Sequence, residues 1–281
     1  MQMRSVLLAA FLAMPPLPAL AAGGEAADQT AAPASHLTLA MALYAGGITL
    51  GKVDMDATII GDKYHAVSNL QTAGIVNALW QSTIQATASG QLSPGHFQPA
   101  LYDSFYTGRS GHKQEVSLTY DSGSVRLYAD PAYSLDKYPV SEAQKKNAYD
   151  PLSAIIYVTS GVGADPKSPC ATVAAVFDGK RRYNIEFKKE KDVQINMDNG
   201  LYKGPGVQCQ AHYNQIAGFS QHVLDENASF PAVHAWFVKF PSAVTGRDYI
   251  VPLRAWADTE YGTVAAVATG LKIDGVDKAD K

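Results

Sequence analysis

Cysteines and charged residues are both scarce in this sequence. Only two of the 281 residues are cysteines, Cys170 and Cys209, and charged residues make up 17% of the chain against 47% hydrophobic residues. This combination excludes a disordered chain. Lysine and arginine number 23 against 26 acidic residues, a balance that gives no indication of nucleic-acid binding. The composition therefore indicates a packed globular protein.

Long apolar runs are also missing. The stretch from Val6 to Leu20 is too short for a stable membrane-spanning helix, and prolines interrupt it. With Arg4 before it and small residues after it, the stretch is typical of a signal peptide over residues 1–21, and an uncleaved membrane anchor is the alternative. Removal of the signal peptide would leave no transmembrane anchor. The remaining predicted parts are a flexible leader, one domain and a frayed tail, at 22–35, 36–275 and 276–281.

The usual catalytic and metal-binding motifs are absent too. The chain has no His-Glu-x-x-His and no Gly-x-Ser-x-Gly pattern, and its seven histidines are scattered. Gly161 to Asp165 does not indicate a dinucleotide-binding loop, since no parallel β–α–β pattern surrounds it. We therefore expect no catalytic residue, no metal site and no cofactor, and we expect that the protein is not an enzyme.

Alternating apolar residues predict strands through most of the domain. Leu37, Leu39, Met41 and Leu43 have the period of a half-buried strand. Similar segments, separated by short turns, continue to Ile273 and give about a dozen antiparallel strands. So many strands in one sheet would normally curl. The predicted fold class is mainly β, with a single curled antiparallel sheet that forms a half-barrel, a spiral or an open barrel.

The two cysteines enclose part of this strand pattern. Asp178-Gly179 favours a two-residue hairpin turn between two of the strands, and a third strand contains Cys209. Behind a signal peptide, two cysteines suit one structural disulfide, and two free buried thiols are the alternative. A bond between Cys170 and Cys209 would close a loop of about 40 residues and stabilise the fold by roughly 4 kcal/mol.

Short segments with helical spacing interrupt the strands. One is Ala73 to Gln81, and a second begins at Asp150-Pro151, an acidic N-cap followed by proline. Ser141 with Glu142 favours a further short helix. We expect these two or three helices to pack on the concave face of the sheet through the apolar residues Ile75, Leu79, Trp80, Leu152, Ile155 and Ile156.

Five residues are candidate ligand contacts: Trp80, Leu79, Ile155, Tyr102 and Arg182. The apolar ones either fill the core or line an apolar pocket. Tyr102 lies in a tyrosine-rich stretch, and tyrosine suits both a wet concave wall and an ordinary strand. Arg182 points to the opposite face from Arg181, so the two arginines do not form one clamp. One of them pairs with an acid inside the curl or binds a ligand carboxylate or phosphate.

Several motifs together resemble a known family. They are Tyr44–Val53, Thr72–Ser82, Tyr149–Ala154, Val176–Tyr183 and Ile216–Gly218. In these stretches, which span nearly all of the mature chain, the sequence resembles the proteobacterial family known as domain of unknown function 3108. The resemblance implies an exported, periplasmic protein, and it implies no chemistry.

Three functions are compatible with these observations. The first is a periplasmic, non-enzymatic monomer that binds an apolar or amphipathic envelope ligand such as a lipid, or an envelope protein, in the concavity. The second is a structural protein of the envelope whose concavity is filled by its own side chains. The third is an envelope hydrolase whose active site matches no recognisable motif.

Overall fold

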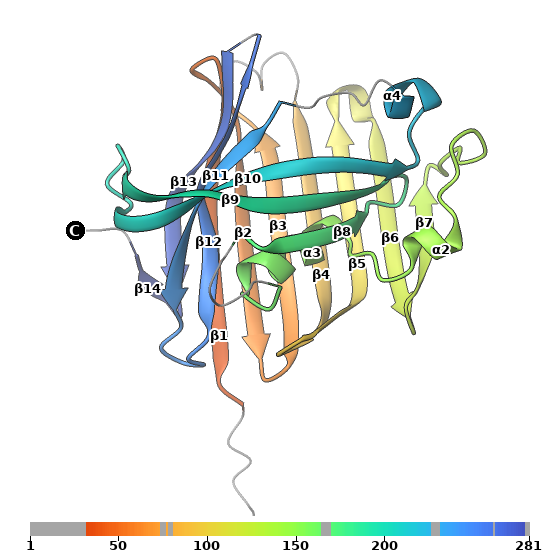
Figure 1. Ribbon diagram of the computed structural model, residues 1–281. Helices are drawn as coiled ribbons and strands as arrows, with labels where there is room; N and C mark the ends of the chain where they lie inside the picture. Colours follow the sequence, from red (N-terminus) through yellow and green to blue (C-terminus); the bar gives the residue numbers. More distant parts are fainter. Residues whose placement is uncertain are drawn as a thin grey trace, which may run out of the picture. The chain divides into compact units, whose positions relative to one another are not determined.

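The structure, a computed structural model, describes residues 32–73, 77, 81–163, 170–225, 231–260 and 262–278. Its described part is one antiparallel sheet of 14 strands that does not close, accompanied by three short α-helices (Figure 1). This architecture confirms the predicted fold class.

The first half of the chain forms a meander in which each strand pairs with the next. Leu39 on the first strand lies opposite Met55 on the second, and both side chains are buried. The alternation in the sequence is therefore that of strands with one face in the core. A 3-10 turn, η1 (Arg109–Gly111), joins the fifth and sixth strands. The strands are β1 (Ala34–Ala45), β2 (Ile48–Ile60), β3 (Lys63–Thr72), β4 (Ser82–Ser93), β5 (His96–Gly108), β6 (Lys113–Asp121) and β7 (Ser124–Asp130).

The second half forms another meander, and β1 pairs with β13 to join the two halves into one sheet. The edge strands β7 and β8 follow each other in the sequence. A short helix, α4 (Gln221–Asp225), follows β10. The strands are β8 (Thr172–Phe177), β9 (Arg182–Asn196), β10 (Lys203–Ala217), β11 (Val233–Pro241), β12 (Asp248–Thr259), β13 (Gly262–Ile273) and β14 (Val276–Asp277).

The sheet curls until its two edges approach each other. In Figure 1, β8, β9 and β10 run across the strands of the first meander. A methyl group added at Gly179, in the turn after β8, would lie 2.9 Å from Val116 on β6 and 3.0 Å from Leu127 on β7. The turn beside one edge of the sheet therefore touches the strands at the other edge.

The segment between the two edges carries two helices, and the second of them lies inside this curl, as predicted. Ser141 begins the first helix with a full capping box. The Asp150 carboxylate accepts a hydrogen bond from the Ser153 N–H at 2.7 Å and begins the second helix, which Gly161 ends with a φ of +72°. The two helices are α2 (Glu142–Lys145) and α3 (Pro151–Thr159). The helix α3 contacts β3, β4 and β5 on one side and β8 and β12 on the other.

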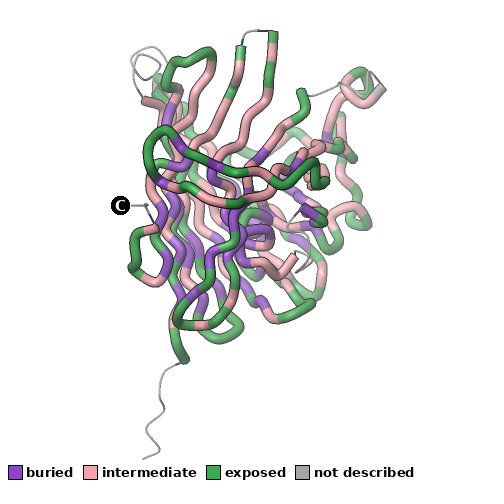
Figure 2. Tube along the Cα trace, turned by 60° about the vertical axis from the view of Figure 1, so that its left-hand side comes forward, coloured by how far each residue is buried: buried purple, intermediate pink, exposed green. Residues whose placement is uncertain are grey.

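Buried residues gather in one half of the sheet. On β3, Tyr64 and Ala66 are buried, whereas the far end of the strand is partly exposed. Figure 2 shows the same gradient along several strands, with buried segments in the lower part and exposed segments above. The core therefore fills the half of the concavity that contains α3.

The predicted turn after β8 is wrong. Phe177 pairs with Arg182, so four residues rather than two form the loop. The carboxylate of Asp178 accepts hydrogen bonds from the N–H groups of Lys180 at 2.9 Å and Arg181 at 2.6 Å. This side chain stabilises the longer loop by replacing backbone partners.

The boundaries of the domain also differ from prediction. The strand β1 begins at Ala34, within the predicted leader, and Val276 and Asp277 pair with β13 instead of fraying. Asp274 links the two ends, because its carboxylate accepts hydrogen bonds from the hydroxyls of Ser35 at 2.8 Å and Ser242 at 2.7 Å. Burial opposes its charge, but these bonds hold the pKa of Asp274 at about 2.

Candidate functional site

A row of apolar side chains crosses the concave face beyond the buried half. The register places Met41, Val53, Leu70, Ile84 and Tyr106 side by side on the neighbouring strands β1 to β5. Along its strand, each of these residues is an even number of positions from the buried residues that face α3, so it points to the same side of the sheet. All five are partly exposed, and Ile84 is 38% exposed. We call these five residues the concave apolar row.

The helix α3 fills the concave face next to this row. Leu152 and Ile156, which are 3% and 1% exposed, join the main core. On the other side of the helix, Ala154 packs against Ala174 and Val176 of β8. The helix is therefore packed between two parts of the same curled sheet. Among the described residues, the concave apolar row is a partly exposed stretch of this face.

A cluster of buried polar groups lies where α3 begins. The Tyr64 hydroxyl is 2.7 Å from the Ser153 hydroxyl, and Asp150 is fully buried. Asp150 Oδ2 and the neighbouring Tyr120 hydroxyl have no well-formed hydrogen bond within the described residues. Burial raises the pKa of Asp150 to about 6, and burial together with the Asp150 charge raises the pKa of Tyr120. A carboxylate in this environment costs stability when it is ionised.

Replacing Asp150 by asparagine should therefore stabilise the protein at neutral pH. A rise from 3.8 to about 6 is about 2 pKa units, or roughly 3 kcal/mol. Because the pKa of Asp150 is higher in the folded state, the protonated carboxyl group favours folding by this amount below the unfolded value near pH 4. This favourable contribution is lost as the pH rises through about 6 and the buried group ionises. Asparagine keeps the helix cap. Urea unfolding between pH 4 and 7.5 should show an advantage of Asp150→Asn that grows with pH, whereas a constant difference would contradict this assignment.

Aromatic rings close the rim beside this cluster. Phe97 stacks on Tyr64 with ring centroids 5.0 Å apart and meets Tyr149 and Tyr157 edge-on at 5.1 and 5.3 Å. Phe97, Tyr149 and Tyr120 line a cavity of about 460 Å³. The cavity lies among the turns at the buried end of the sheet, away from the concave apolar row.

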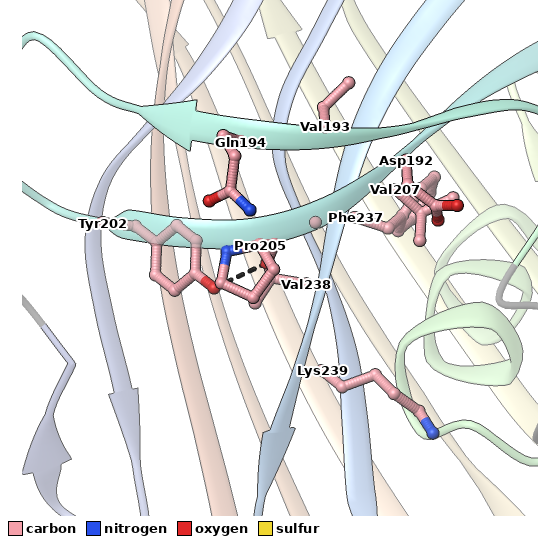
Figure 3. A pocket seen from close by; sticks show the side chains of 10 residues that line it. Asp192, Val193, Gln194, Tyr202, Pro205, Val207, Phe237, Val238 and Lys239 are labelled. Atoms are coloured by element: carbon pink, nitrogen blue, oxygen red, sulfur yellow. Dashed lines mark hydrogen bonds between the residues drawn. The ribbon is translucent and has the colours of Figure 1, made fainter.

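A larger cavity of about 590 Å³ lies between β9, β10 and β11 (Figure 3). Its charged side chains and the Tyr202 hydroxyl already have partners. The Tyr202 hydroxyl donates a hydrogen bond to the Pro205 carbonyl at 2.7 Å, and Lys239 forms an ion pair with Asp248 at 3.3 Å. Asp192 pairs with Lys189 at 2.8 Å. With its charged groups engaged, this cavity offers fewer groups for recognising a ligand than its size suggests.

The predicted apolar ligand residues do not form one site in the described part of the chain. Trp80 and Leu79, together with Ile75, lie outside the described residues. Ile155 is 46% exposed, so its predicted packing on the concave face is wrong. It lies one turn after Pro151 on the side of α3 that has no neighbouring strand, whereas Leu152 and Ile156 pack as predicted.

Tyr102 and Arg182 lie within the curl, but neither side chain offers a free polar group to the concave apolar row. Tyr102 is 6% exposed, and burial raises its pKa to about 12. Arg182 donates hydrogen bonds to the Gln144 carbonyl at 3.0 Å and to Asn184 Oδ1 at 2.7 Å, and burial lowers its pKa. Within the described residues, Arg182 thus contacts neutral oxygens and not the acid that was predicted as a partner for one of the two arginines. These contacts hold β9 to the end of α2.

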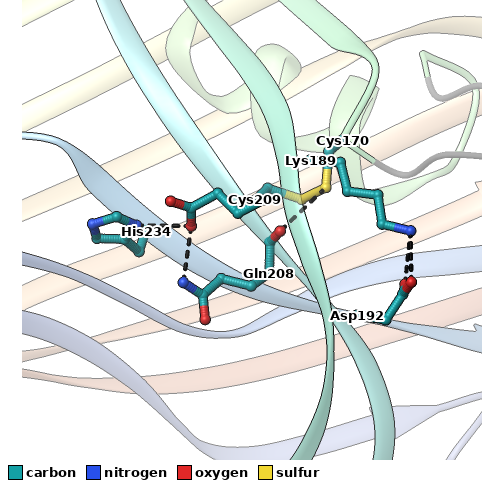
Figure 4. The surroundings of a disulfide bond; sticks show 7 residues. Cys170, Lys189, Asp192, Gln208, Cys209 and His234 are labelled. Carbon is teal, nitrogen blue, oxygen red and sulfur yellow. Dashed lines mark hydrogen bonds and ion pairs between the residues drawn. A yellow bond between two sulfur atoms is a disulfide. The ribbon is translucent and has the colours of Figure 1, made fainter.

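Cys170 and Cys209 form the predicted disulfide (Figure 4). Their Cα atoms are 5.6 Å apart, and both side chains are fully buried. The bond ties Cys170, two residues before the edge strand β8, to β10, and the two cysteines pack with Val158 of α3. The disulfide therefore holds one wall of the curl against the helix.

The sequence reasoning did not identify the concave apolar row as a site. The alternation of Leu37, Leu39, Met41 and Leu43 predicts an inward face, but alternation along one strand does not tell which residues meet across five strands. The burial of Asp150 was also missed, because a helix cap alone explains an acid before proline. The described residues include no group of three or more His, Cys, Asp or Glu side chains arranged to hold a metal ion.

Comparison with known proteins finds a family and a similar solved structure. A crystal structure of a beta-barrel-like protein of domain of unknown function DUF1849, from Brucella abortus, is similar to this chain with a TM-score of 0.48 and 10% sequence identity. The match covers 86% of this chain and 97% of that protein. No curated protein matches, and no helix in the described part is long and apolar enough to cross a bilayer. The family model described as "Protein of unknown function (DUF3108)" matches residues 40–269, so the chain belongs to this family of unknown function.

Proposed function

We propose that this protein binds an apolar or amphipathic ligand along the concave apolar row and does so without catalysis. The observation that supports this proposal is that Met41, Val53, Leu70, Ile84 and Tyr106 form one partly exposed apolar surface inside the curl. An apolar surface of this kind gains free energy when a ligand removes it from water, at about 25 cal/mol per Å². Concave apolar surfaces are where small ligands usually bind.

The shape of the site favours a chain-like ligand. The row runs across five strands that are each about 4.8 Å from the next, so it is roughly 20 Å long. A single acyl chain could follow it in an extended form. The proposed setting is the periplasm, which the disulfide and the predicted signal peptide both support, and the proposed ligand is an envelope lipid or a similar amphiphile.

A fluorescent fatty acid such as parinaric acid provides a direct test. Ile84→Asn should weaken its binding by about 10- to 100-fold, the equivalent of the 1.5–3 kcal/mol gained by burying one such side chain. Phe105→Asn is the matched control, because Phe105 is also 38% exposed and adjoins Tyr106, so it points to the opposite face of β5. Its binding should match the wild type.

The outcome separates specific from nonspecific binding. If both substitutions weakened binding equally, or if both variants bound the probe as the wild type does, the probe would not use the concave apolar row. Absence of binding to the wild type would also overturn the proposal. Thermal melts of both variants show whether either substitution has unfolded the protein.

A structural role is the second candidate function, and the packing of α3 favours it. Leu152 and Ile156 fill half of the concavity with the protein's own side chains. If no ligand of any class associates with the native protein, the curled sheet would serve as a scaffold for an envelope partner.

A further inference from the structure

Arg254 on β12 lies between two tryptophans. Its guanidinium carbon is 5.3 Å from the centre of the Trp236 ring and 5.1 Å from the centre of the Trp256 ring. The two indoles meet edge to face at 5.3 Å, and His234 stacks on Trp256 at 5.4 Å. A guanidinium held in this way is already ordered, so it loses little conformational freedom when it binds a partner.

These side chains lie on one face of β11 and β12, opposite to the face that meets Val158 of α3. Trp236 pairs with Arg254 across β11 and β12, so both point to the same side. Ala235, the neighbour of Trp236, points to the other side, where it packs with Val158 of α3. Trp236 packs against the main core, and Arg254 lies on β12, outside the five strands that carry the concave apolar row.

The acid of this cluster is already engaged by other residues. Glu190 accepts a hydrogen bond from Gln208 Nε2 at 2.9 Å, and its carboxylate is 2.8 Å from His234 Nδ1. None of the ion pairs within the described residues includes Arg254. The positive charge of Arg254 is therefore not compensated by a neighbouring acid.

The guanidinium of Arg254 is more deeply buried at Nε than at its two terminal nitrogens. Arg254 Nε is buried and has no hydrogen-bond partner within the described chain, whereas the two terminal nitrogens are not among the buried atoms that lack partners. The terminal nitrogens are therefore not fully buried. An oxyanion can accept two parallel N–H···O bonds from the two terminal nitrogens, and the flanking rings strengthen the attraction by excluding water.

We propose that Arg254, with Trp236 and Trp256, forms a binding site for an oxyanion, meaning the phosphate or carboxylate group of a ligand. The two indoles hold the guanidinium in place and the terminal nitrogens bind the anion. The site is independent of the proposed binding of an amphiphile, so either proposal can fail without the other.

Tryptophan fluorescence of the full protein provides the test, because Trp236 and Trp256 touch the guanidinium. Phosphate and acetate are titrated separately, with chloride used to hold the ionic strength constant. The fluorescence of the wild type should change in a saturable way with at least one anion. The anion that saturates at the lower concentration carries the preferred group. Arg254→Gln should weaken binding at least 10-fold, and Arg254→Lys should weaken it less because it keeps the charge but loses the paired donors.

Arg126→Gln is the matched control, since Arg126 is an exposed arginine on β7 and its loss changes the net charge equally. It should bind anions as the wild type does. Line broadening of phosphate in ³¹P NMR spectra gives a readout that does not depend on the indoles, and circular dichroism checks folding. No saturable response in the wild type, or equal effects of Arg254→Gln and Arg126→Gln, would show that Arg254 only spaces the two tryptophans.

Discussion

Replacing Ile156 by alanine should lower the free energy of unfolding by about 2–5 kcal/mol, the usual cost of removing a large aliphatic side chain from a core. Ile156 is 1% exposed and lies in the main core, between α3 and the sheet. A helix of nine residues is not stable alone, so its position depends on this packing. In a domain of this size the melting temperature should fall by roughly 2–4 °C per kcal/mol.

Ile155 provides the control for this experiment within the same helix. It is adjacent to Ile156 and has the same side chain, but it is 46% exposed. Ile155→Ala should change stability by no more than about 0.5 kcal/mol. If the two substitutions had equal effects in urea unfolding, α3 would not be packed in the concavity as the structure places it.

Loss of the disulfide should have an effect of similar size. Cys170 and Cys209 are 39 residues apart, and opening a loop of this length costs about 4 kcal/mol on a chain-entropy estimate. The double substitution to alanine should therefore lower the melting temperature by roughly 8–16 °C. Melting the wild type with and without dithiothreitol separates the bond itself from the packing of the two sulfurs.

Thiol labelling of denatured protein checks the premise of this prediction. Protein prepared from an oxidising compartment should react with no thiol reagent until it is reduced, and it should then react at two positions. Two reactive thiols before reduction would show that no disulfide stabilises the protein, although the two residues lie close enough to form one.

Much of the fold was predictable because its signals are local. Leu37 and Leu39 alternate as strand residues do, and Asp150-Pro151 starts α3 where a cap and a proline indicate a helix. The end of β9 was not predicted, because the residues from Lys188 to Asp192 are all exposed and show no alternation. A strand that is polar on both faces gives no periodic signal.

The site was less predictable because it depends on contacts between distant residues. The pairing of β1 with β13 brings together segments more than 200 residues apart, and no local pattern specifies it. The same limit applies to Asp274, which orders the end of the domain only through contacts with Ser35 and Ser242. Arg254 and Trp236 likewise meet only through the register of β11 and β12.

The central claim is that the concave apolar row binds an amphiphile. Native mass spectrometry of the protein isolated from the proposed compartment, the periplasm, tests this claim most directly. Wild type should carry a bound lipid or similar amphiphile that dissociates on activation, and Phe105→Asn should carry the same species. Ile84→Asn should carry much less of it, because this side chain forms part of the row. A bare protein mass for the wild type, or equal occupancy in Ile84→Asn and Phe105→Asn, would contradict the claim.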